Sequence, residues 1–115
     1  MKKINIVKSN LEFNNIIHKG NKYVSNIFYT YVLINNYNYN RYGIAISTKI
    51  GNAVIRNKYK RQIKDIIDKI KINTYGYDII FIARQQINQK NYLQIKEDII
   101  KIINMIGEKN EKQKN

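Results

Sequence analysis

The chain contains no cysteine and no proline, and it has a single histidine. Without cysteine, neither a disulfide nor a thiolate metal site can form, and a lone His18 excludes a histidine-rich metal cluster. No apolar run is long enough to span a bilayer, and the first ten residues, MKKINIVKSN, lack the apolar core of a signal peptide. These absences predict a cytoplasmic protein with no membrane segment.

Carboxylates are scarce as well. The 115 residues include 8 Asp and Glu against 21 Lys and Arg, which gives a formal net charge of +13. Clustered cations gain free energy by neutralising phosphates and releasing counterions, so this imbalance is typical of small polyanion-binding domains. The length and the 43% hydrophobic content fit one domain over residues 1–115, with a modest core.

The spacing of apolar residues predicts three helices and three strands. β-Branched and aromatic residues mark the first two strands, which we expect to pair as a hairpin, and a continuous apolar run marks a third, buried strand. The fold class is α+β: a two-layer sandwich of order α-β-β-α-β-α, with helices on one face of the sheet and room for an extra short strand. The expected elements are a helix at 10–19 capped by Asn10, strands at 26–34 and 42–47, a helix at 54–72, a strand at 78–83, a helix at 92–106 and a frayed tail at 107–115.

The helix at 54–72 carries positive charge alone on the first turns of its polar face. Arg56, Lys60 and Lys64 follow one another at i,i+4, where like charges destabilise a helix by a few tenths of a kcal/mol per pair. Cations in the first turn also oppose the helix macrodipole. An external polyanion would offset both penalties, so we interpret this surface as a nucleic-acid-binding site.

Gly51 and Asn52, just before this helix, fit the same interpretation. Glycine permits a tight strand-to-helix turn and the close approach of another backbone, and asparagine can cap the helix. The free N–H groups at the start of a helix are themselves a phosphate-binding site.

Around these residues the sequence resembles the protein subunit of bacterial ribonuclease P. The family's signature block is present without a gap, and the similarity extends to HKG at 18–20, RYGIAIS at 41–47 and DIIFIAR at 78–84. Thr48 and Gln62 depart from the residues most common in the family, as does Ile17, where a second aromatic is common. The matching residues of the block are Lys49, Gly51, Asn52, Ala53, Val54, Arg56, Asn57, Lys58, Lys60 and Arg61.

This resemblance implies a role in tRNA maturation. In the family an RNA subunit carries the catalysis and removes the 5′ leader of precursor tRNA, using Mg²⁺ that is bound mostly by RNA. The protein binds that RNA and the leader, and we expect a monomer in a 1:1 complex with the RNA. The residues implied to bind the RNA subunit are Lys49, Asn52, Arg56, Asn57, Lys58, Lys60, Arg61 and Lys64. The resemblance also implies a left-handed crossover between the last two strands, against the general right-handed rule.

A cleft between the first helix and the sheet is implied to receive the leader. Alternation along the strand at 26–34 places Tyr29 and Tyr31 on one face and Phe28 on the other. Aromatic rings suit a leader of any sequence, because every base has a π-face on which a ring can stack. Without the resemblance, aromatic residues on a strand would more often be assigned to the core. The implied cleft residues are Phe13, Ile17, Tyr29, Tyr31, Ala45 and Ser47.

The sequence gives less support to other functions. A protein-only nuclease needs carboxylates gathered around a metal, but the lysines beside Asp65 and Asp68 explain these two as ion pairs. Glu97 and Asp98 suit the early turns of a helix. A helix-turn-helix DNA-binding protein is disfavoured because the basic helix follows a strand. The main alternative is a general RNA-binding or ribosomal-type protein without a role in processing, which fits the charge but not the signature block.

Overall fold

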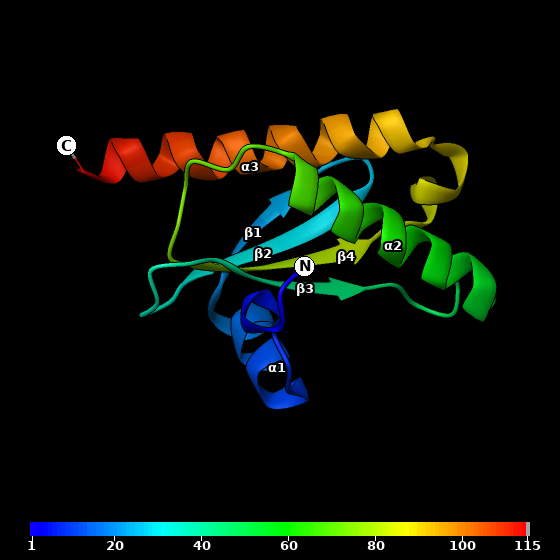
Figure 1. The fold of residues 1–115 in the computed structure, drawn as a ribbon, viewed down its shortest axis with the longest axis horizontal. Coiled ribbons are helices and arrows are strands. Elements are labelled where there is room, and N and C mark those ends of the chain that lie inside the picture. Colours follow the sequence, from blue (N-terminus) through cyan, green and yellow to red (C-terminus); the bar gives the residue numbers. More distant parts are fainter. Residues whose placement is uncertain (115) are drawn as a thin grey trace.

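The computed structural model describes the backbone of residues 1–114, and the side chains of all of these except residues 4 and 109–114. Within that range it contains one four-stranded sheet, three α-helices and two short 3-10 helices (Figure 1). The predicted α+β class is confirmed, and β1 is the extra short strand. The elements are η1 (Lys3–Asn5), α1 (Asn10–Lys19), β1 (Asn21–Val24), β2 (Phe28–Ile34), β3 (Arg41–Ala45), α2 (Ala53–Lys69), β4 (Tyr77–Ala83), η2 (Gln85–Gln89) and α3 (Tyr92–Lys114).

The strands lie in the order β1-β2-β4-β3. β2 is antiparallel to both neighbours, with Tyr31 opposite Lys22 on β1 and opposite Ile80 on β4. β3 is parallel to β4. The predicted hairpin between β2 and β3 is therefore wrong, because β4 lies between them. A turn-forming loop between two apolar strands favours a hairpin locally. β4 is almost wholly buried, and at the centre of the sheet it pairs its backbone on both edges and buries both faces.

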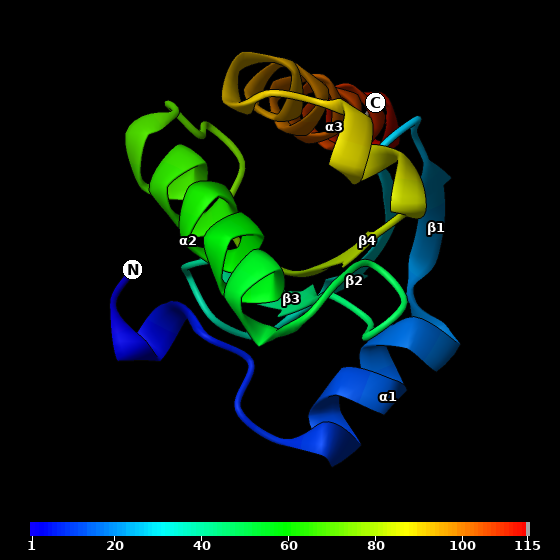
Figure 2. The ribbon, with the colours of Figure 1, turned by 90° about the vertical axis from the view of Figure 1, so that its right-hand side faces the viewer.

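β3, α2 and β4 form the left-handed crossover that the resemblance implied. Parallel neighbours cannot be joined by a tight turn, so the chain must cross one face of the sheet between them. In Figure 2 the ends of β3 and β4 point toward the viewer, and the chain runs from β3 through α2 to β4 in a clockwise direction. Clockwise rotation with an advance toward the viewer is left-handed.

Different helices cover the two faces of the sheet. α2 and α3 pack on one face and α1 on the other (Figures 1 and 2). The expectation that all helices share one face is thus wrong for α1. The apolar spacing of α1 indicates that one side of the helix is buried, but it does not indicate which face of the sheet buries it. β4 presents apolar side chains on both faces of the sheet, so either face could have received α1.

The main core lies between the sheet and the pair α2 and α3. At its centre Phe28 and Phe81 are fully buried and pack edge to face, with ring centroids 5.4 Å apart. A smaller cluster lies under α1, where Val7, Ile16 and Ile80 are buried. The two helices of the main core contribute Tyr59, Ile63, Ile66, Ile67, Ile95, Ile99, Ile102, Ile103 and Ile106.

Element boundaries differ modestly from the predicted ones. Ser9, not Asn10, caps α1, its hydroxyl accepting a backbone N–H at 3.1 Å. α2 ends at Lys69, before its predicted end, and α3 continues through Lys114, beyond its predicted end. Fraying of residues 107–115 in solution stays a prediction. Over the described residues, no helix has the length and apolar character needed to cross a membrane.

Candidate nucleic-acid interface

The start of α2 is built around Gly51 and Asn52, as predicted. The Asn52 side chain caps the helix by accepting the backbone N–H of Ile55 at 3.1 Å. Arg56 folds back, and its Nε donates to the Gly51 carbonyl at 3.2 Å. A Cβ on Gly51 would lie 2.9 Å from Ile55 Cγ2, so glycine permits this close turn. The turn fixes the direction in which α2 projects past the end of the sheet (Figure 1).

The predicted RNA-subunit residues lie along the outward side of α2 and the turn before it. The buried side of the helix is fixed by Tyr59, Ile63, Ile66 and Ile67, so the charged side faces solvent. In the described part of the chain, none of these cations pairs with a carboxylate. Their charges are therefore available to an external anion. Exposed members are Lys49, Asn52, Asn57, Lys58, Arg61 and Lys64, and half-buried members are Arg56 and Lys60.

Two of these cations also reach the other predicted site. Lys60 and Lys64 line a pocket of about 160 Å³ together with Phe13, Gly43 and Ile44. The pocket lies at the β3 edge of the sheet, where α2 and α1 both approach. The structure therefore brings the basic helix and the predicted cleft together at this edge.

Phe13, Ile17 and Tyr31 of the predicted cleft lie together. All three are half-buried and pack on the apolar cluster under α1. A Cβ on Gly43 would lie 2.6 Å from Phe13 Cε2, so the Phe13 ring rests directly on the β3 backbone. The predicted alternation along β2 is confirmed, since Phe28 is fully buried in the main core on the opposite face.

Ala45 and Ser47 are placed differently from each other. Ala45 ends β3 and lies opposite Ile82 of β4, which packs on the cluster under α1. Ser47 lies beyond the strand, is exposed, and accepts the backbone N–H of Lys49 at 3.0 Å. Ser47 thus shapes the turn into α2 and is not part of the apolar cluster.

Two cations beside Tyr29 were missed by the sequence reasoning. The Nζ of Lys22 lies 4.5 Å from the Tyr29 ring centroid and 5.8 Å from that of Tyr31. The Cζ of Arg84 lies 4.7 Å from the Tyr29 centroid. The signal for Lys22 would have been its register opposite Tyr31, but β1 has four residues and a polar pattern too short to indicate a strand.

Arg41 was also missed, and it ties α1 to the sheet. Its guanidinium donates to Asp78 at 2.7 and 2.9 Å and to Glu12 of α1 at 3.2 Å. Hydrogen bonding to the buried Asp78 raises the pKa of Arg41 above its ordinary value. Arg41 thus links Glu12 of α1 to Asp78 of β4 across the face of the sheet that α1 covers.

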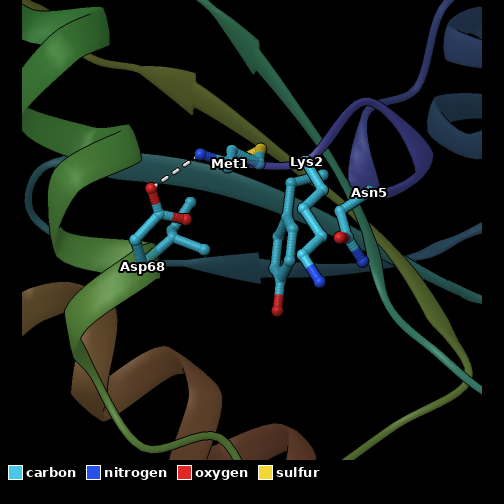
Figure 3. A pocket seen from close by; sticks show the side chains of 6 residues that line it. Met1, Lys2, Asn5 and Asp68 are labelled. Carbon is cyan, nitrogen blue, oxygen red and sulfur yellow. Dashed lines mark hydrogen bonds and ion pairs between the residues drawn. The ribbon is translucent and has the colours of Figure 1, made fainter.

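The carboxylates that a protein-only nuclease would need are dispersed. In the part of the chain that the structure describes, no three His, Asp or Glu side chains gather as a possible metal site. Asp65 accepts the Tyr92 hydroxyl at 2.6 Å and pairs with Lys69 at 3.1 Å, and these contacts lower its pKa. Asp68 pairs instead with the Met1 amino group at 2.8 Å, beside a separate hollow (Figure 3). The predicted lysine partner is therefore found for Asp65 but not for Asp68.

Cations along α2 that form no ion pair with the described residues, together with half-buried aromatic rings under α1, indicate a small nucleic-acid-binding α+β protein. The family model described as Ribonuclease P matches residues 1–107. The ribonuclease P protein component of Mesoplasma florum is 42% identical over 105 residues, covering 90% of this chain and 96% of that one. The component from Clostridium botulinum (strain 657 / Type Ba4) is 37% identical over 107 residues, covering 91% and 96%.

A solved structure agrees with this similarity. That of a Staphylococcus aureus RNase P protein mutant with defective mRNA degradation activity matches with a TM-score of 0.85 and 34% identity, over 91% of this chain and 90% of that one. The chain belongs to the ribonuclease P protein family. Ribonuclease P is a ribonucleoprotein endonuclease whose RNA carries the catalysis, so this chain is a non-catalytic subunit that partners the ribonuclease P RNA.

Proposed function

We propose that this protein binds the catalytic RNA through the outward side of α2 and the 5′ leader of precursor tRNA through the cleft under α1. The observation that carries the proposal is the meeting of the two residue sets at the β3 edge, where Lys60 and Lys64 face Phe13 across one pocket. A leader emerging beside RNA bound on α2 would enter the cleft at this edge.

The chemistry of each surface suits its proposed ligand. The outward side of α2 offers cations that form no ion pair within the described residues, and such cations bind phosphates of folded RNA regardless of base sequence. The cleft offers Tyr31 and Phe13 on an apolar floor, where an unpaired base can stack. A leader is single-stranded, so its bases are free to do so.

The same proposal covers the ions and the assembly. Mg²⁺ would support cleavage by the holoenzyme and would be held mostly by RNA, since the carboxylates described above are dispersed and engaged elsewhere. Among the residues whose side chains are described, no group of carboxylates fits a protein-held Mg²⁺ centre. We further propose a 1:1 complex of one protein with one RNA, acting in the cytoplasm.

Reconstitution tests the proposal. Addition of the protein to a ribonuclease P RNA at low Mg²⁺ should restore cleavage of a precursor tRNA at the 5′ end of the mature sequence. A general RNA-binding protein would bind several RNAs without restoring cleavage, and that result would overturn the assignment to leader removal.

A further inference from the structure

One amide side chain outside α2 holds both this helix and the turn before it. Asn88 belongs to η2, the short helix that follows β4 in the chain. Its Nδ2 donates to the Ile50 carbonyl at 2.9 Å. Its Oδ1 accepts the Tyr59 hydroxyl, also at 2.9 Å. A single side chain therefore joins the turn before α2 to the second turn of the helix, and both points lie within the block of predicted RNA-binding residues.

Asn88 is held in place by its neighbours in η2. Ile87 is fully buried in the main core. The backbone N–H groups of Ile87 and Lys90 donate to the carbonyls of Arg84 and Ile87 at 3.0 and 3.1 Å, which closes the short helix. The Asn88 side chain is itself exposed, so it adds little to the core. Its position is thus fixed, and its contacts are the two hydrogen bonds to the start of the α2 region.

The turn at residues 47–52 has few other links to the rest of the protein. Ser47 accepts the N–H groups of Lys49 and Ile50 within the turn, at 3.0 and 3.1 Å. Asn52 and Gly51 bond to the first turns of α2. Among the hydrogen bonds of the described residues, only the one from Asn88 ties this turn to a part of the chain beyond α2. The buried Ile50 side chain is its other anchor.

We propose that Asn88 is a positioning residue for binding of the ribonuclease P RNA, acting through its bonds to the turn and to Tyr59. The inference rests on the proposed RNA-binding side of α2. Lys49 adjoins the carbonyl that Asn88 holds, and the Nζ of Lys58 lies 5.4 Å from the Tyr59 ring centroid. Both cations therefore stand next to a point that Asn88 fixes. A surface already ordered in the free protein costs less to order when RNA binds.

The test titrates a ribonuclease P RNA with the full chain at several salt concentrations. Asn88→Leu keeps the approximate size of the side chain and removes both hydrogen bonds. It should weaken RNA binding roughly fivefold, the ratio that corresponds to one net hydrogen bond. Because every cation is still present, the slope of log K against log salt should not change. Lys49→Gln should weaken binding and also lower that slope by about 0.7–0.9. Gln89→Leu, at an exposed neighbour on η2, is the matched control.

Two further variants separate positioning from direct contact with RNA. Tyr59→Phe removes only the hydroxyl and should cause a smaller loss of affinity than Asn88→Leu. In the Tyr59→Phe background, Asn88→Leu should cost less than it does alone, because one of its two bonds is already gone. Asn88→Gln keeps the amide and should recover part of the affinity. In the free Asn88→Leu protein, the backbone N–H of Ile50 should exchange with solvent faster.

The outcomes are distinguishable. If Asn88→Leu binds RNA normally while Lys49→Gln does not, the inference is wrong and the RNA-binding surface stands. If Lys49→Gln changes neither affinity nor slope, the proposed surface is wrong at this turn, and the inference fails with it. A lowered slope for Asn88→Leu, or a penalty undiminished by Tyr59→Phe, would show that Asn88 contacts RNA itself and would overturn positioning.

Thermal melts decide whether the losses are only structural. Equal losses of affinity with Asn88→Leu and Gln89→Leu would indicate a general disturbance of η2 and would overturn the inference. If Asn88→Leu does not fold, Tyr59→Phe decides alone: it must weaken RNA binding at an unchanged salt slope, and normal binding by this variant would show that the bond from Asn88 has no part in RNA recognition.

Discussion

At the scale of single residues, alternation along β2 places the two tyrosines that we propose for leader binding on one face of the sheet and a core phenylalanine on the other. Phe28 is fully buried against Phe81, while Tyr29 and Tyr31 point to the α1 face and keep part of their surface in solvent. This alternation could be predicted from the sequence because it depends on local spacing, and the signature residues could be predicted because they match the family's block. Lys22, Arg84 and Arg41 could not, because their partners are set by strand register and by the packing of α1.

The two faces of β2 predict opposite consequences for two aromatic deletions. Tyr31→Ala should weaken holoenzyme binding to precursor tRNA by up to roughly a hundredfold, since a stacked base contributes about 1–3 kcal/mol. Binding of mature tRNA, which has no leader, should hardly change. Phe28→Ala should instead destabilise the fold by about 3–5 kcal/mol by opening a cavity.

Binding assays with both tRNAs and a thermal melt of each variant check this pair. Tyr31→Leu keeps apolar packing on the cluster under α1 without an aromatic face, so it should bind precursor tRNA poorly and melt close to the unmodified protein. Normal precursor binding by Tyr31→Leu would argue that Tyr31 acts through packing alone.

At the scale of elements, the three α-helices differ in what they cover and what they present to solvent. α3 and α2 complete the main core, α2 also presents cations to solvent, and α1 covers the opposite face of the sheet, where it would form one wall of the proposed cleft. The existence and type of these helices followed from apolar periodicity. The face of the sheet that each helix covers could not be predicted from the sequence, and neither could the insertion of β4 between β2 and β3. Both depend on contacts between residues distant in the chain.

Removal of single positive charges from α2 should weaken binding to the catalytic RNA and leave the protein folded. Arg61 is exposed, and Arg56 holds only the Gly51 carbonyl by a side-chain hydrogen bond, so neither supports the core. Arg56→Ala and Arg61→Ala should each weaken binding to the catalytic RNA and reduce the salt slope by roughly one. Titration of the RNA at several salt concentrations measures both effects, with Lys71→Ala, beyond the end of α2, as the control. An unfolded Arg61→Ala protein, or an unchanged slope, would contradict this placement.

The ion pairs of Arg41 with Asp78 and Glu12 predict a large loss of stability for one substitution and a small loss for another. Arg41→Ala would leave the carboxylate of Asp78, which is 5% exposed, without its cation, and removal of one partner of a buried pair typically costs about 3–5 kcal/mol. Glu12→Gln breaks a partly exposed pair and should change the free energy of unfolding by less than about 1 kcal/mol. It should still loosen α1 and weaken precursor binding.

Thermal melts and precursor binding of both variants test this bridge. Adding Asp78→Asn to Arg41→Ala removes the uncompensated charge and should recover part of the lost stability. If Glu12→Gln leaves precursor binding unchanged, α1 is held by its apolar contacts and the bridge does not set the cleft width.

At the scale of the whole molecule, the net charge destabilises the compact fold that the modest core stabilises. A formal charge of +13 on 115 residues repels itself in the compact state, and this repulsion is relieved when an anion binds. Two of the surfaces described above, the side of α2 and the Lys22 and Arg84 pair, concentrate cations without acidic partners in the described residues. Composition alone indicated the excess, whereas the fold decides where it gathers.

The free protein should therefore be stabilised by a small polyanion more than by salt of the same ionic strength. Inorganic triphosphate at a hundred times its dissociation constant should add about 2.7 kcal/mol to the free energy of unfolding. At about 4 °C per kcal/mol for a domain of this size, the melting temperature should rise by roughly 10 °C. Sodium chloride at matched ionic strength screens the repulsion but occupies no site, so its effect should be smaller. Arg61→Ala and Lys22→Gln should each reduce the triphosphate shift, and Lys71→Ala should not. Equal shifts with triphosphate and chloride, or equal reductions by all three variants, would show that diffuse screening and not clustered sites governs the stability of the free protein.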